Sequence, residues 1–460
     1  MSQKIFDKRL KFVDSIISLA KKEKEIKQKI YLLENINYYM TNNHCGVFRY
    51  EPMEELLQEI GRDFVVDNQV NTVKNSFLHI MTKASVTGGH TRVVENFIKN
   101  RRRCDEKHHV VLISQNNETK PDFCKELESK NELFDLSNLD VLEKIREICL
   151  VSGKYEYIIL HHHMYDVLPI IALSQFKNKK NIYAYNHADH LYWVGSSILT
   201  GSFEMSTDGM NFTRQRRGIK NTYLLPIPLT QQNKIKTDLK EKLNITDNKK
   251  VILTIGSQDR FVTNEYSYKD MLKEVLSKED VYFIIVGKHV QEFWEDLWNH
   301  PNIRFVGIIP KEQLGEYYSI ADLYVDSFPM GGSTATLDAL CYEIPSIKVK
   351  HIFFEFDSLK AFLVDKKDVR QKICKILYLE NSIDYGNMEI HFTQQWNERV
   401  NNVKLMKTKY EEASKYEEAS KYDENLYEFQ KLLKFKKVNS FIKNLNFLNT
   451  VKYLLILVFL

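Results

Sequence analysis

The stretch of residues 321–350, ADLYVDSFPMGGSTATLDALCYEIPSIKVK, constrains the fold of this chain more than any other part of the sequence. Its residues 323–328 alternate apolar side chains with Tyr and Asp, a pattern that predicts a strand. Pro329 has no amide proton for a sheet ladder, so we expect it to end that strand. Gly331 and Gly332 then predict a loop.

A helix is predicted directly after the two glycines. Ser333 or Thr334 is expected to cap it, and Ala and Leu recur at helical spacing behind them. A second strand is expected over residues 344–349. Because backbone amides and the positive end of a helix meet at the glycines, this point predicts an anion site, and a phosphate is the anion expected. An ordinary strand–helix unit whose glycines only turn the chain is the alternative.

This block resembles the donor-nucleotide segment of GT-B glycosyltransferases, such as families 1 and 4, and the resemblance extends over residues 77–350. It implies that the diphosphate of a nucleotide sugar is held by Gly331, Gly332, Ser333 and Thr334. It also implies that Asp338 binds the ribose hydroxyls. Many retaining members carry a pair of glutamates here, whereas this chain has Met330 and Asp338 at the matching positions. Retention or inversion at the anomeric carbon therefore stays open.

Composition limits the class of protein. A length of 460 residues suits two or three domains, and 43% apolar and 27% charged residues are typical of a globular protein. The net charge of +4 is too small to indicate a nucleic-acid partner. The six cysteines lack metal-ligand spacing and are expected to be reduced thiols of a cytoplasmic protein. The charged start, MSQKIFDKRLKF, argues against a signal peptide.

Strands that alternate with helices begin near residue 76, and this alternation predicts an α/β fold with parallel sheets. The GT-B resemblance implies two Rossmann-like domains that face a cleft, with helical extensions at both ends of the chain. The expected segments are a helical N-terminal extension (1–75), an acceptor domain (76–235), a nucleotide-sugar donor domain (236–400), and a charged repeat with a basic amphipathic tail (401–460).

Polar loops follow the predicted strands of the first domain, where ligands bind in parallel sheets. One loop contains Gly88, Gly89 and His90. The resemblance implies that a glycine-rich loop at this point approaches the donor diphosphate and the acceptor. All three residues are therefore site candidates.

Histidines fill two further loops. Residues 161–163 are consecutive histidines, and NHADH contains His187, Asp189 and His190. A histidine beside a carboxylate can take a hydroxyl proton near neutral pH, so His90 or His187 is the expected base of an inverting reaction, with Asp189 as the carboxylate. Clustered histidines can also bind a metal ion. The resemblance implies that none is needed, and the chain lacks the Asp-x-Asp pair of GT-A enzymes.

Basic and glycine residues follow predicted strands of the second domain. Arg260 comes after the strand that begins near residue 251, and Lys269 lies further along the chain. The resemblance implies a basic pair here that neutralises the leaving diphosphate, and both residues are candidates for it. A surface ion pair is the alternative for Lys269. The resemblance implies that Gly307, within a strand expected over residues 303–309, lies against the nucleotide base.

The C-terminal part changes character. Residues 409–424 hold a six-residue repeat, KYEEAS, which is expected to form a solvated helical spacer. Residues 431–460 intersperse lysines with apolar residues at helical spacing and end in YLLILVFL. That apolar run is far shorter than the ~20 residues needed to span a bilayer. Two alternatives are open for this segment: a basic helix on an anionic membrane surface, or a helix packed on the protein itself. We predict the membrane-surface helix.

These features predict a GT-B glycosyltransferase that moves a sugar from a nucleotide-diphosphate sugar to a glycan or lipid-linked acceptor in surface polysaccharide or glycan assembly. No cofactor and no nucleic-acid partner are expected. A cytoplasmic location is expected, peripheral to the membrane if the tail binds lipid. Two alternatives remain: a sugar-nucleotide epimerase on the same fold, and a non-catalytic sugar-nucleotide-binding scaffold.

Overall fold

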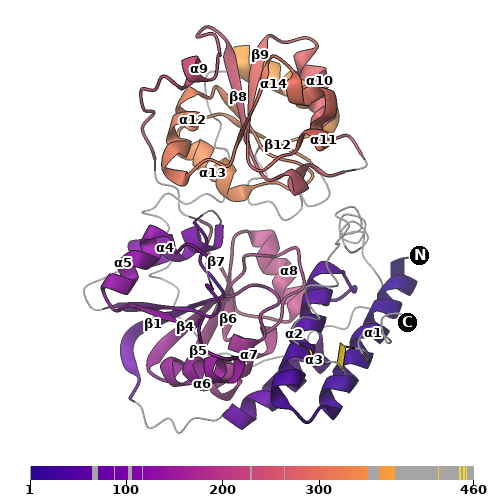
Figure 1. Ribbon diagram of the computed structural model, residues 1–460, viewed down its shortest axis with the longest axis vertical. Helices are drawn as coiled ribbons and strands as arrows, with labels where there is room; N and C mark the ends of the chain where they lie inside the picture. Colours follow the sequence, from indigo (N-terminus) through magenta and orange to yellow (C-terminus); the bar gives the residue numbers. More distant parts are fainter. Residues whose placement is uncertain are drawn as a thin grey trace. The chain divides into compact units, whose positions relative to one another are not determined.

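The computed structural model describes residues 2–64, 71–86, 89–101, 106–116, 118–227, 231–263, 265–350, 362–378, 423, 445–446, 449–450 and 452. Contacts along the chain divide the protein into two compact units. Unit 1 comprises residues 1–225 and 397–460, and unit 2 comprises residues 226–396. Each unit is a central sheet with helices packed against it (Figure 1).

The sheet of unit 1 has parallel strands in the order β3-β2-β1-β4-β5-β6-β7. The strands are β1 (Val73–Met81), β2 (Lys107–Leu112), β3 (Leu133–Asp135), β4 (Tyr155–His161), β5 (Asn181–Tyr185), β6 (Gly201–Glu204) and β7 (Thr222–Leu224). The chain winds outward in one direction from β1 to β3 and then crosses to β4 on the other side of β1. Ligands bind beyond the carboxyl ends of the strands at such a switch point.

Helices cover both faces of this sheet. The apolar side chains of α4 (Gly89–Arg101) and α5 (Asp122–Ser129) form one core with alternate residues of β1 and β2. The other face packs against α6 (Val141–Ser152) and α7 (Leu168–Leu173). Asp140 begins α6 with a capping box that also uses Glu143. Helix α8 (Thr207–Arg217) contacts β6 and β7.

The N-terminal helices belong to the same core as α6 and α7. They are α1 (Ser2–Lys22), α2 (Ile26–Asn42) and α3 (Glu51–Gly61), and the apolar side of each is buried. The carboxylate of Glu54, in α3, is buried and accepts a hydrogen bond from the amide of Gly195 at 2.8 Å. These helices therefore pack on the main fold of unit 1.

Unit 2 repeats the arrangement, with parallel strands in the order β10-β9-β8-β11-β12-β13. The strands are β8 (Lys250–Ile255), β9 (Val281–Val286), β10 (Ile303–Gly307), β11 (Leu323–Val325), β12 (Ser346–Val349) and β13 (Leu363–Val364). The helices are α9 (Leu239–Lys242), α10 (Tyr268–Leu276), α11 (Gln291–Trp294), α12 (Leu314–Ile320), α13 (Ser333–Cys341) and α14 (Val369–Tyr378). The strand order reverses at β8, whose neighbours are β9 and β11.

The two parallel sheets confirm the predicted α/β fold class. The strand expected over residues 323–328 ends earlier, at Val325, because the residues that follow form a loop around Asp326. The short strands β3, β6, β7 and β13 were not predicted.

Candidate functional site

The histidine loops of unit 1 lie at the carboxyl ends of β4 and β5. β4 ends at His161, and β5 ends at Tyr185, two residues before His187. A small pocket that is partly open to solvent lies here, and its lining includes His162, Tyr185, Asn186, His187 and Trp193. Aromatic faces beside a few polar groups are the usual lining of a small-molecule site.

The two predicted base candidates, His90 and His187, lie against each other. Their rings stack with centroids 4.0 Å apart, and the ring of His163 approaches His90 edge-on at 5.5 Å. Burial lowers the pKa of His90 to about 4, and His163 adds to this. Burial, and then the neighbouring His90, hold the pKa of His187 well below its usual value. Both rings are therefore neutral at pH 7 and able to accept a proton.

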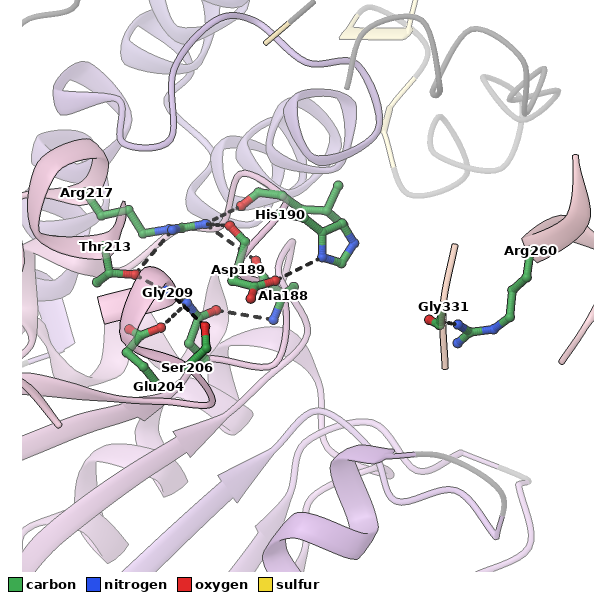
Figure 2. A network of polar contacts seen from close by, with 12 residues as sticks. Ala188, Asp189, His190, Glu204, Ser206, Gly209, Thr213, Arg217, Arg260 and Gly331 are labelled. Atoms are coloured by element: carbon green, nitrogen blue, oxygen red, sulfur yellow. Dashed lines mark hydrogen bonds and ion pairs between the residues drawn. The ribbon is translucent and has the colours of Figure 1, made fainter. Parts of the chain in front are cut away.

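Asp189 does not pair with His187 as expected. Its Oδ1 lies 3.3 Å from Nδ1 of the adjacent His190. Figure 2 marks this contact with a dashed line. His187 instead places Nε2 at 3.1 Å from Nδ1 of His161. The ring orientation of His187 is thus set by another histidine and not by the carboxylate in its own loop.

Arg217 anchors the loop that carries these residues (Figure 2). Its buried guanidinium donates to the main-chain oxygens of Asp189 at 2.8 Å and Leu191 at 2.7 Å. At the start of the loop, the side-chain amide of Asn186 donates to Glu204 Oε2 at 2.8 Å. Charged groups strengthen such hydrogen bonds, so α8 and β6 hold the loop in place. The sequence did not predict a role for Arg217. The signal that was present is the group of three arginines in the four residues 214–217.

In unit 2, Arg260 contacts the glycine loop directly (Figure 2). It follows β8, and Nη1 of its guanidinium donates to the carbonyl oxygen of Gly331 at 2.6 Å. The amide of Met330 donates to the carbonyl oxygen of Arg260 at 3.3 Å. The loops after β8 and β11 meet because these two strands are neighbours at the switch point.

A buried ion pair lies against this glycine loop. The side chains of Lys348 and Asp326 are 3% and 1% exposed, and they contact each other. The amide of Gly332 donates to both carboxylate oxygens of Asp326, at 2.9 and 3.0 Å. This amide is already paired within the protein, which corrects the expectation that it is free for a diphosphate.

The start of α13 also differs from the expectation. The helix begins at Ser333, and Gly332 is in the N-cap position. The expected cap by Ser333 or Thr334 is therefore wrong. The first amides of a helix have no acceptor within the helix, so those of Ser333 and Thr334 remain the donors at this end. Asp338 lies one turn further along α13 and is partly buried.

The two loop glycines predict different responses to substitution. A methyl group at Gly331 would lie 2.6 Å from Oδ2 of Asp326 and 2.9 Å from Nζ of Lys348, whereas at Gly332 the nearest atom would be 3.5 Å away. We expect Gly331→Ala to lower the free energy of unfolding by about 1–3 kcal/mol, the usual cost of overpacking, and Gly332→Ala by less than ~1 kcal/mol. Chemical denaturation measures both, and equal losses would contradict the expectation.

Of the remaining donor-site candidates, Lys269 and Gly307 are in unit 2 and Gly89 is in unit 1. Lys269, in α10, forms an ion pair with Glu295 at 3.4 Å, which supports the surface ion-pair alternative. Gly307 is exposed at the end of β10 and has a φ of 73°. Gly89 begins α4, and Gly88 lies outside the described residues.

The described cysteines are reduced, as the sequence predicted. Cys45, Cys124, Cys149, Cys341 and Cys374 are free thiols, and Cys104 lies outside the described residues. In the part of the chain that the structure describes, no three His, Cys, Asp or Glu side chains converge as metal ligands would.

One residue of the C-terminal repeat is described, and it is buried in unit 1. Asp423 Oδ1 lies 2.6 Å from Nε2 of His44 and 2.9 Å from a guanidinium nitrogen of Arg216. Asp423 belongs to the third copy of the repeat, KYDENL, where it replaces a glutamate of the first two copies. At this position the repeat is not a solvated spacer, which corrects that expectation.

The described residues of the tail contact the N-terminal helices. Leu445 packs against the core of unit 1, and the amide of Asn446 donates to the side chain of Gln28 at 2.7 Å. These contacts support the alternative in which the tail packs on the protein, and most of 431–460 lies outside the described residues. Among the helices that are described, none has the length and apolar character to cross a membrane.

Comparison by sequence gives no match, either to protein-family models or to curated proteins. Comparison by structure matches glycosyltransferases. The Anabaena protein HepE, in complex with UDP and glucose, has a TM-score of 0.51 at 13% identity, over 71% of this chain and 98% of that one. The lipopolysaccharide outer core galactosyltransferase WaaB has a TM-score of 0.51 at 14% identity, over the same shares, 71% and 98%. A glycosyltransferase from Rickettsia africae has a TM-score of 0.50 at 14% identity, over 79% of this chain and 100% of that one.

At these identities the likeness is one of fold. It covers nearly the whole of each solved chain, and it agrees with two all-parallel sheets whose strand orders each reverse once. The predicted resemblance is confirmed at this level: the chain has the GT-B fold of these glycosyltransferases.

Proposed function

We propose that this protein is a glycosyltransferase that moves a sugar from a nucleotide-diphosphate donor to a hydroxyl group of an acceptor. One observation carries the proposal. His187, with a lowered pKa and stacked on His90, lines a pocket at the carboxyl ends of the strands of unit 1. A neutral histidine in such a place can take the proton of an attacking hydroxyl. The GT-B fold supports the transferase class.

Unit 2 supplies the donor half of the proposal. The guanidinium of Arg260 lies beside Gly331, and α13 directs the amides of its first residues, Ser333 and Thr334, toward the same end of the sheet. Positive charge and amide donors at this point stabilise the negative charge that develops on a leaving diphosphate. Because the amide of Gly332 binds Asp326, the glycine loop acts by positioning α13 and Arg260.

Calorimetric titration of the full chain with UDP, GDP, ADP and dTDP tests the donor class. We expect at least one nucleoside diphosphate to bind and to bind more weakly to Arg260→Ala. If none of the four produces heat at millimolar concentration, a nucleotide-sugar donor is excluded and the proposal falls.

Arg260→Ala should also slow catalysis. The substitution removes the cation at the glycine loop, and one such contact supplies about 2–4 kcal/mol of transition-state stabilisation. We expect kcat/KM to fall by about 30- to 1000-fold, as that free energy implies. Arg370→Ala is the matched control, because Arg370 lies on α14 and pairs with Glu274 and Glu279. Equal rates for the two variants would remove Arg260 from the site.

The pH profile follows from the lowered pKa of His187. A base that becomes protonated only well below pH 6.5 stays able to accept a proton as the pH falls through 6.5. We therefore expect kcat/KM to be unchanged between pH 8 and pH 6.5 and its acid limb to lie below pH 6.5. A limb centred at or above pH 6.5 would show that the base is a histidine of ordinary pKa or another group.

A further inference from the structure

Four buried or partly buried histidines form one hydrogen-bonded chain in unit 1. Nε2 of His187 lies 3.1 Å from Nδ1 of His161, whose Nε2 lies 3.2 Å from Nδ1 of His79. Nε2 of His79 lies 3.2 Å from Nδ1 of His108, and Nε2 of His108 lies 3.4 Å from a carboxylate oxygen of Glu106. Every link joins Nε2 of one ring to Nδ1 of the next, so the rings run head to tail.

The sheet sets this geometry. His108 is on β2, His79 on β1 and His161 on β4, which are neighbouring strands. In the register, His108 is opposite Phe77 and His161 is opposite Met81, each two residues from His79. The three rings therefore share one face and follow a diagonal from Glu106 toward the carboxyl ends of the strands.

The carboxylate decides the direction of the donors. An ionised carboxylate only accepts hydrogen bonds, so Nε2 of His108 must carry the proton. A neutral ring carries one N–H, so Nδ1 of His108 is then an acceptor, and Nε2 of His79 must donate to it. The same reasoning gives a proton on Nε2 of His161 and on Nε2 of His187. Nδ1 of His187 is left with a lone pair, and no partner within the described residues engages it.

We propose that Glu106, His108, His79 and His161 are positioning residues that hold His187 in the tautomer with a proton on Nε2. Nδ1 of His187 is then the atom that accepts the proton of the attacking hydroxyl. This assignment names the atom of the proposed site that takes the proton, and it rests on the proposed function for the identity of the reaction. A catalytic histidine usually donates its other ring N–H directly to a carboxylate or carbonyl oxygen; here the carboxylate acts through three further rings.

Burial agrees with this assignment. His79, His108 and His161 are each 0–1% exposed, and burial lowers the pKa of His161 to about 3. A buried ring that stays neutral has one proton and two possible positions for it, so a fixed acceptor at the end of the chain is needed to select one tautomer.

NMR of protein labelled with ¹⁵N in its histidines tests the histidine chain without any activity assay. The ¹⁵N shifts of a neutral ring report which nitrogen carries the proton, and the signal lost in His187→Gln identifies His187. We expect a proton on Nε2 in the wild type, and the same in Glu106→Gln, whose amide oxygen can still accept from His108. In Glu106→Leu we expect the Nε2–H fraction of His187 to fall about twofold, since neither direction of the chain is then favoured.

His109→Gln is the matched control, because His109 is the next residue of β2 and its ring contacts Phe134 and Tyr155 on the other face. This variant should leave the tautomer of His187 unchanged. A proton on Nδ1 of His187 in the wild type would overturn the proposal, and this result depends on no variant of Glu106. An unchanged tautomer in Glu106→Leu would overturn it as well.

Kinetic measurements distinguish a failure of the histidine chain from a failure of the proposed function. We expect Glu106→Leu to lower kcat about tenfold and to leave the KM for the donor unchanged. This loss is a part of the ~10²–10⁴-fold rate increase that acid–base catalysis typically supplies. Glu106→Gln should keep most of the activity. The expected tautomers in a protein that transfers no sugar would support the chain and count against the proposed function alone.

Discussion

His187→Gln is expected to lower kcat by about 10²–10⁴-fold, the usual contribution of a general base, while the protein stays folded. The amide nitrogen of glutamine can replace Nε2 as a donor to His161, which His187 approaches at 3.1 Å. The substitution therefore keeps the buried hydrogen bond and removes only the group that accepts a proton. Steady-state kinetics and a thermal melt of the same samples separate the two effects.

The control is His190→Gln. His190 is in the same loop and contacts Asp189, and it is not a member of the hydrogen-bonded histidine chain, so it is an equivalent side chain to replace. We expect kcat of this variant to stay near the wild-type value. Wild-type turnover by His187→Gln would show that the base is elsewhere, and His90, stacked on His187, would be the next residue to replace.

Lys348→Met is expected to cost about 3–5 kcal/mol of the free energy of unfolding, the usual result of leaving one partner of a buried ion pair alone. Asp326 would remain 1% exposed without its cation, although it keeps the hydrogen bond from Gly332. Because Asp326 also positions the glycine loop, nucleoside diphosphate binding should weaken in the variant. Denaturant titration of the full chain measures the stability.

Lys350→Met is the matched control for this variant. Lys350 follows the same strand two residues later, and its partner Asp365 lies at 3.4 Å, but their side chains are 40% and 54% exposed. Exposed ion pairs contribute roughly 0–1 kcal/mol, so this variant should be nearly as stable as the wild type. If the two variants lose equal stability, the buried pair does not hold the loop.

Local patterns were sufficient to predict most of the fold. The apolar runs of β8 and β9 and the strand–glycine–helix order around Gly331 and Gly332 depend on neighbours in the sequence, and the two parallel sheets followed from their alternation with helices. Short strands such as β6 (Gly201–Glu204) and β7 (Thr222–Leu224) were missed, because three or four residues give too little pattern to recognise.

The details of the site depend on strand register, which the sequence does not display. Asp326 and Lys348 meet because Tyr324 is paired with Ser346 and Val325 with Ile347 in neighbouring strands. The histidine chain likewise needs the registers of β1 with β2 and with β4. Histidines inside or at the end of apolar strands, at positions 79, 108 and 161, were the local signal of it.

The most direct test of the central claim is product analysis of the full-length protein incubated with a panel of nucleotide sugars and hydroxyl acceptors. We predict that one nucleotide sugar is consumed, that nucleoside diphosphate is released, and that the sugar appears on an acceptor or, slowly, on water. An isomeric nucleotide sugar in place of these products would identify an epimerase. Binding without any turnover would identify a scaffold, and either result would contradict the account.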